Sequence, residues 1–418
     1  MALLTRLERA SRRTPAYRWY ALGVTTYSQA AVAALVSAVG PLAPLLLADF
    51  RVSRAEIGLT TSATYLSSSA IALWGGRAAD RVGERRVLLI SGVIVGLAAL
   101  LALRAASFWP FLGVCFVIGF GSGIQNPAGS AAIMRWFPRR QRGFAMGIRQ
   151  TGVPLGGVLA ASLWPVIGVA LGWRWAYLVG GSVMLLGALS IAVAYYDPIR
   201  PATAAKIGPR RLADLVADRQ MLWLGIVFLT QIAAQQAAMT YFVLFLNEAA
   251  GVAVVLAAAL LAVVNFVAIS ARIGWGLLSD RRFGGDRKPV LSILVLLSAA
   301  AMLLAAALPS HAPLALAGVL ALLLGASVFA WTGVIGALVI ETAGPESAAS
   351  AMALAMTIAA PGSLLGPPLF GLLADRTGSY RVAWLAAAAV VGFGLFALSR
   401  VKERSAGGGL NVVGGTGV

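Results

Sequence analysis

The chain has 418 residues, of which 60% are hydrophobic and only 11% are charged, and its mean hydropathy is +0.86. A soluble domain carries about 25% charged residues, so this composition excludes an ordinary soluble protein. The net charge of +18 does not indicate nucleic-acid binding, because the basic residues gather in short loops between long apolar runs. Those runs are long enough for spanning helices, and we expect an all-α integral membrane protein.

Hydropathy along the chain predicts twelve spanning helices in two groups of six. The first group covers residues 19–196, the second covers 220–400, and a polar cytoplasmic linker at 197–219 joins them. A segment at 1–18 precedes the first group, and a tail at 401–418 follows the second. The expected spans are 19–44, 55–78, 87–104, 108–134, 143–167, 174–196, 220–247, 252–278, 289–309, 312–340, 348–373 and 381–400.

Basic residues are distributed unequally between the expected loops. Most of the 33 lie in the N-terminal segment, the linker, the tail and the loops near 77–86, 135–142 and 281–288, all on one side. The positive-inside rule makes that side cytoplasmic, so we expect both termini in the cytoplasm and a bacterial inner-membrane location. The opposite loops carry Arg51, Arg54, Arg104, Arg174, Arg376 and Arg381.

One loop pattern occurs in both halves. Gly76-Arg77-Ala78-Ala79-Asp80-Arg81-Val82-Gly83-Glu84-Arg85-Arg86 lies between the second and third expected spans. A looser copy, Gly276-Leu277-Leu278-Ser279-Asp280-Arg281-Arg282, follows the eighth span and ends in Arg287-Lys288. Glycine permits close helix approach and positive φ, and an aspartate at a helix end can cap a helix or pair with arginine. The repetition predicts two pseudo-symmetric six-helix bundles.

This pattern resembles the signature loop of the major facilitator superfamily of transporters, which joins the second and third helices and recurs more weakly between the eighth and ninth. The resemblance implies transport by alternating access and a gating role for the loops. A third similar segment, Gly371–Gly378, falls on the opposite side of the expected topology, and we interpret it as an ordinary turn with capping residues. The expected gating residues are Gly76, Asp80, Arg81, Gly83, Arg85, Arg142, Gly276, Asp280 and Arg281.

Two arginines lie within the expected spans, whereas all 15 acidic residues lie in loops, in tails or at span ends. Arg149 is about 10 Å inward from Arg142, and Arg272 is about 12 Å inward from Asp280, at 1.5 Å per helical residue. An arginine at mid-membrane costs roughly 2.5–3.5 kcal/mol on insertion scales. A substrate anion bound by the planar guanidinium would account for both arginines. The alternative is that each arginine snorkels or donates to helix carbonyls.

The resemblance extends to the two arginine segments. Ala271–Asp280 is similar to helix eight of the oxalate/formate exchanger and monocarboxylate transporter branch, where an arginine at this place engages the substrate carboxylate. Met146–Gly157 resembles the Gly-Pro-rich motif of helix five, and helices five and eight of this fold pack against each other. The resemblance therefore implies that both guanidinium groups face one cavity. Further expected lining residues are Tyr27, Gln125, Asn126, Gln231, Gln235, Tyr241, Asn265 and Trp331, for each of which helix–helix hydrogen bonding is an equal alternative.

The sequence therefore predicts a secondary transporter for a small organic anion, a mono- or dicarboxylate, working as an exchanger, a uniporter or a proton symporter. The alternatives are a multidrug or sugar exporter, or a nitrate or cyanate carrier of the same fold. Cys115 and His311 are the single cysteine and histidine, so no metal site, cofactor or catalytic set is expected and the chain is not an enzyme. Its expected partners are the anion and the lipid bilayer, with no nucleic acid and a monomeric state.

Overall fold

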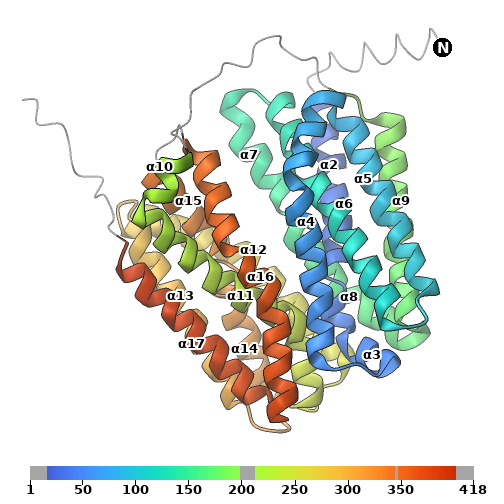
Figure 1. The fold of residues 1–418 in the computed structure, drawn as a ribbon, viewed down its shortest axis with the longest axis vertical. Coiled ribbons are helices and arrows are strands. Elements are labelled where there is room, and N and C mark those ends of the chain that lie inside the picture. The colour runs from blue at the N-terminus through green and yellow to red at the C-terminus, as the bar shows by residue number, and fades with distance from the viewer. Residues whose placement is uncertain (1–16, 198–211, 344–346, 402–418) are drawn as a thin grey trace, which may run out of the picture.

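The computed structural model describes residues 17–197, 212–343 and 347–401 (Figure 1). All regular secondary structure in these residues is helical. The first half contains α2 (Tyr17–Val36), α3 (Val39–Phe50), α4 (Arg54–Val82), α5 (Glu84–Leu101), a short 3-10 turn η1 (Ala102–Arg104), α6 (Phe108–Trp136), α7 (Arg139–Gln150), α8 (Gly152–Leu171) and α9 (Trp173–Ala194). The second half contains α10 (Leu212–Ala217), α11 (Arg219–Glu248), α12 (Val254–Arg282), α13 (Arg287–Ala307), α14 (Leu314–Ala326), α15 (Thr332–Ala343), α16 (Ala348–Thr377) and α17 (Tyr380–Ser399).

The prediction of twelve spans in two bundles is confirmed for the described residues. Ten helical stretches are long and apolar enough to cross a membrane. Two further spans complete the twelve. The second span in chain order is α4, whose many serines and threonines lower its hydropathy, and the tenth is formed by α14 and α15 together. The expected N-terminal segment, most of the linker and the tail lie largely outside the described residues.

Three spans are each divided into two helices, which the sequence analysis did not anticipate. The first breaks at Ser37 and the fifth at Thr151, and in each case a proline follows, at Pro41 and Pro154. Proline lacks an N–H and clashes with the carbonyl four residues earlier, which accounts for both positions. The tenth span breaks over residues 327–331, where the Phe329 N–H bonds the Leu324 carbonyl and skips the usual partner.

The two bundles meet at one end of the molecule and diverge toward the other, where α7 and α10 lie (Figure 1). At the closed end α16 packs along α4, α3 packs against α11, and α8 packs on α12. Backbones approach closely there. A Cβ on Gly40 would lie 2.1 Å from the Met239 carbonyl oxygen, and one on Gly58 would lie 2.6 Å from the Pro367 backbone. Glycine at these positions is therefore a condition of closure.

Candidate functional site

A pocket lies between the two bundles, at the depth where the three spans are broken. From the first half come residues beside two of the breaks and two residues of α4; from the second half come residues of α11, α12 and the third break. Arg272 is the one charged residue among the described residues that line it, and none of them is acidic. The lining residues are Val36, Ser37, Val39, Gly40, Thr61, Tyr65, Val153, Pro154, Gln235, Gln236, Met239, Thr240, Asn265, Ala268, Arg272 and Phe329.

The break in the tenth span positions Arg272. Its Nε donates to the Phe329 carbonyl at 3.1 Å, and Trp275, on the same face of α12, donates from Nε1 to the Ala326 carbonyl at 2.7 Å. Both carbonyls lie at the point where regular helical bonding stops, so α12 supplies their donors. The terminal nitrogens of Arg272 have no hydrogen-bond partner among the described residues. The pocket therefore holds a guanidinium whose forked edge is available to an anion.

Arg149 has a different environment from Arg272. Its exposed fraction is 0%, and it does not line the pocket. Its Nη2 donates to Gln29 Oε1 at 2.7 Å and to the Asn126 carbonyl at 3.3 Å, while its Nη1 donates to Ser130 Oγ at 3.1 Å and to Asn126 Oδ1 at 3.4 Å. The two guanidinium groups thus do not share this pocket, because Arg149 faces α2 and α6 of its own half.

Apart from Asn126 and Tyr241, the remaining expected lining residues lie at the pocket, inside one bundle or on the outer surface of the first bundle. Gln235 and Asn265 line the pocket with Arg272. Trp331 is not a lining residue, but its Nε1 donates to Gln235 Oε1 at 3.0 Å. Gln125 and Gln231 are buried inside their own bundles, where they donate to Ser28 and Ser298. Tyr27 is 42% exposed on the outside of the first bundle and donates to the Val183 carbonyl. Sequence reasoning missed Tyr65 and Gln236 as lining residues, although Gln236 directly follows Gln235.

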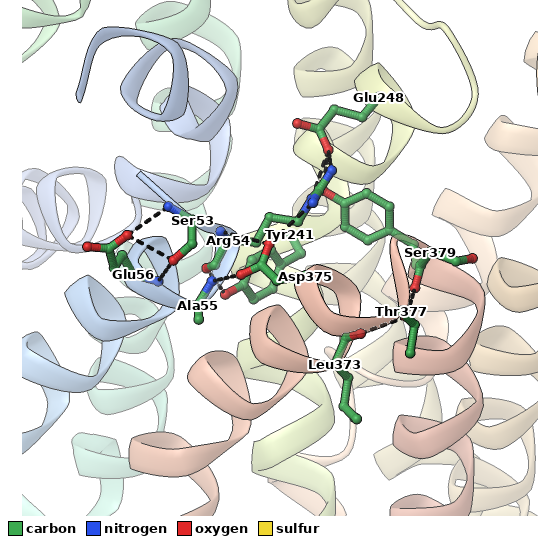
Figure 2. A network of polar contacts seen from close by, with 11 residues as sticks. Ser53, Arg54, Ala55, Glu56, Tyr241, Glu248, Leu373, Asp375, Thr377 and Ser379 are labelled. Atoms are coloured by element: carbon green, nitrogen blue, oxygen red, sulfur yellow. Dashed lines mark hydrogen bonds and ion pairs between the residues drawn. The ribbon is translucent and has the colours of Figure 1, made fainter. Parts of the chain in front are cut away.

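An ionic closure joins the halves at the closed end (Figure 2). Arg54, the first residue of α4, contacts Glu248 on α11 at 2.7 Å and Asp375 on α16 at 3.2 Å, and its Nε donates to the Tyr380 hydroxyl at 2.9 Å. Asp375 also accepts from the Arg54 N–H at 3.2 Å and from the Ala55 N–H at 2.9 Å. An acid from one half thus caps the positive end of a helix in the other.

This closure corrects two interpretations of the sequence. The Gly371–Gly378 segment does end α16 at a left-handed Gly378 and is followed by the capping Ser379, but it is more than an ordinary turn because its Asp375 bridges the two halves. Tyr241 lies in the closure and not in the pocket, since its hydroxyl contacts the Arg54 carbonyl at 2.6 Å and the Pro367 carbonyl at 2.9 Å. Arg54 could have been singled out from the sequence only as a basic residue on the basic-poor side.

At the opposite end, the first signature loop is tied to its own bundle. Gly83 has φ +98°, and Asp197 Oδ1 accepts from the Arg85 N–H at 2.7 Å. A Cβ on Gly83 would lie 2.2 Å from an Asp197 carboxylate oxygen, so glycine is needed there. Buried Glu84 pairs with Arg135 of α6. Arg142 donates to the Phe137 carbonyl, Arg81 is exposed, and the Asp80 side chain lies outside the described residues.

The second loop is likewise bound within its own half. Arg287, at the start of α13, contacts Asp280 at 2.6 Å and Glu341 of α15 at 3.1 Å. Gly276 is half-buried without close neighbours, and Arg281 is exposed. The ion pairs of Glu84 with Arg135 and of Arg287 with Asp280 and Glu341 therefore lie inside one bundle, whereas at the other end those of Arg54 with Glu248 and Asp375 cross between bundles.

Comparisons with known proteins agree with this architecture. The family model described as Major Facilitator Superfamily matches residues 26–367. The chain is 28% identical over 374 residues to the probable sulfoacetate transporter SauU of Cupriavidus necator, covering 85% of this chain and 87% of that protein. It is 24% identical over 386 residues to the hexuronate transporter of Bacillus subtilis, covering 87% and 90%.

A similar solved structure is that of a bacterial homolog to the human lysosomal transporter Spinster, in an inward-facing and occupied conformation. It aligns with a TM-score of 0.79 at 19% identity, over 93% of this chain and 98% of that chain, and so supports the fold. With twelve spans in two bundles and an inter-bundle pocket, the chain belongs to the major facilitator superfamily and is a multi-pass membrane transporter, not an enzyme.

Proposed function

We propose that this transporter carries a small organic anion, a mono- or dicarboxylate, by alternating access across the bacterial inner membrane. The observation that carries the proposal is Arg272, a guanidinium in the inter-bundle pocket that has, among the described residues, no partner for its terminal nitrogens and no carboxylate in the pocket lining. A cation kept in such a place is stabilised when an anion completes its hydrogen bonds. The two relatives named above are described as transporters of organic anions, which supports the same class.

The distribution of basic loops assigns a direction to the structure. The open end carries the basic signature loops, which the positive-inside rule places in the cytoplasm. On that assignment the structure is inward-facing, the Arg54 closure seals the periplasmic side, and the pocket exchanges with the cytoplasm. Alternating access then requires the Arg54 contacts to break as the cytoplasmic ends of the bundles come together.

The pocket lining disfavours cationic drugs and neutral sugars as substrates. A carrier of cationic drugs is expected to present an acid, and the described lining contains none. A carrier of neutral sugars would leave Arg272 without a reason to bear its insertion cost. Exchange, uniport and proton symport all remain compatible with a pocket of this kind.

Uptake into proteoliposomes tests the proposal, using labelled sulfoacetate, glucuronate and a set of small mono- and dicarboxylates. Arg272→Ala removes a charge-assisted contact worth about 1.5–3 kcal/mol, so affinity for a transported anion should fall roughly 10- to 150-fold. Arg272→Lys should also be weak, because an ammonium cannot form the forked contact.

Arg282→Ala is the matched control. It removes the same charge from the exposed end of the same helix and should leave anion affinity unchanged. Anion uptake by Arg272→Ala at the wild-type level would refute the site. Uptake restricted to neutral or cationic compounds would refute the substrate class.

A further inference from the structure

We infer that the transported substrate is a monoanion: one carboxylate attached to a neutral remainder that offers a hydrogen-bond acceptor. The inference rests on the proposed function and adds the charge and the chemistry of the rest of the molecule. Its first support is the charge inventory of the pocket, where the described lining contains one cation, Arg272, and no acid. One carboxylate neutralises this site, and a second would find only uncharged groups.

Arg149 does not supply a second cation. Four hydrogen bonds to neutral acceptors occupy its terminal nitrogens, its exposed fraction is 0%, and its Nε, which has no partner among the described residues, is buried away from the pocket. Its guanidinium also lies against Gly129, where a Cβ would be 2.4 Å from Nη2. The space around the charge is therefore filled.

The location of the partners of Arg149 decides what happens during transport. Gln29 belongs to α2, and Asn126 and Ser130 belong to α6, so every partner lies in the same bundle as Arg149 itself. Alternating access in this fold is largely a rigid-body movement of one bundle against the other. Such a movement leaves contacts within a bundle intact, so Arg149 stays enclosed in both states. A second carboxylate in the pocket would thus be desolvated without a paired charge, which is strongly unfavourable.

A separate observation describes the neutral part of the substrate. Gln236 on α11 lines the pocket, its exposed fraction is 3%, and among the described residues its Nε2 makes no hydrogen bond of standard geometry, although its side chain lies beside the Tyr65 hydroxyl. A buried amide donor without an acceptor is destabilising, and native proteins rarely retain one without a purpose. A hydroxyl, oxo or amide oxygen on the substrate would accept this bond while the carboxylate contacts Arg272. The opposing wall from the first half, with Val36, Val39 and Val153, contributes no charge.

Matched anions separate charge from shape. Succinamate and succinate are nearly isosteric, but at pH 7.5 the first carries one charge and the second carries two. Glucuronate and glucarate form a larger pair with the same difference, and 4-hydroxybutyrate and butyrate differ in the acceptor alone. For each compound, two quantities are measured: the concentration needed to raise Tm of the detergent-purified transporter, and the uptake into proteoliposomes. At least one monoanion should act at about tenfold lower concentration than its dianionic counterpart, and 4-hydroxybutyrate should act at lower concentration than butyrate.

Two variants extend the test. Gln236→Leu should remove the advantage of 4-hydroxybutyrate over butyrate and keep the discrimination by charge. Gln235→Lys adds a second cation to the pocket lining and should move the preference toward the dianion of a pair.

The outcomes distinguish this inference from the proposed function. If succinate or glucarate acts as well as its monoanionic partner, and the effect depends on Arg272, the monoanion inference is overturned and anion transport stands. If dianions alone act, the result is the same. If no anion stabilises the protein or enters the vesicles, the proposed function itself is refuted.

Discussion

Replacing Asp375 with alanine should open the closed end of the transporter. The change removes a carboxylate that caps α4 through two backbone N–H groups and pairs with Arg54 at 3.2 Å. Loss of a helix cap costs about 1 kcal/mol. The ion pair is partly solvated, since the side chains of Arg54 and Asp375 are 28% and 23% exposed, and adds at most about 1 kcal/mol.

Because these contacts exist only when the two bundles meet at this end, their loss acts on the equilibrium between states. A difference of about 2 kcal/mol changes the ratio of closed to open molecules roughly 30-fold. Asp375→Asn should have a smaller effect, because asparagine keeps a capping oxygen and loses the charge.

Double electron–electron resonance, which measures the distance between two spin labels, provides the assay. Spin labels on Ala106→Cys and Thr377→Cys, in a Cys115→Ala background, report the separation of the two bundles at this end. The long-distance population should grow in Asp375→Ala. Glu56→Gln is the control, because Glu56 bonds Ser53 within its own half. A distance distribution identical to that of the wild type would refute the role assigned to Asp375.

Three further outcomes are expected. Gly40→Val should prevent closure at the same end, because even a Cβ there would lie 2.1 Å from the Met239 carbonyl oxygen; the same spin labels should report a larger separation, and an unchanged one would contradict the close approach. Arg149→Met should lower the free energy of unfolding by about 1–3 kcal/mol, because buried Gln29 would lose its donor; an unaltered Tm would argue against this enclosure. Ser379→Cys in a Cys115→Ala background should react with an impermeant thiol reagent in intact cells. Reaction only after lysis would show that the assigned membrane orientation is wrong.

Much of the architecture was predictable from the sequence, because the spans and loops of a membrane protein are marked by local composition. Apolar runs located the spans, and the repeated loop around Gly83 and Asp280 located the matching positions of the two halves. Pro154, three residues after the break between α7 and α8, is only a partial signal for it, since Pro127 and Pro165 lie inside helices that continue unbroken. The break before α15 has no proline, and local composition does not indicate it.

For the candidate site, the sequence predicted how deep the two arginines lie in the membrane, but it did not predict which way their side chains point. Arg149 and Arg272 lie at similar distances from the membrane surface, yet one faces its own bundle and the other the space between bundles. Helical rotation decides this, and a single sequence without strong amphipathicity does not encode it clearly. The closure was missed for another reason: Arg54 and Asp375 are 321 residues apart, and only the packing of α4 against α16 brings them together.

The short helix α15 connects the pocket to the loop at the open end of the molecule. Arg272 contacts Phe329, just before α15 begins, and Glu341 near its other end pairs with Arg287, which also contacts Asp280. From Thr332 to Glu341 the helix rises about 14 Å, so a tilt of about 10° about its pocket end displaces Glu341 by roughly 2.4 Å. If that displacement is directed away from Arg287, it adds to the 3.1 Å between the two side chains and breaks their ion pair. The pocket contact of Phe329 and the ion pair of Glu341 thus lie at the two ends of one short helix, so a change in the tilt of α15 would alter both.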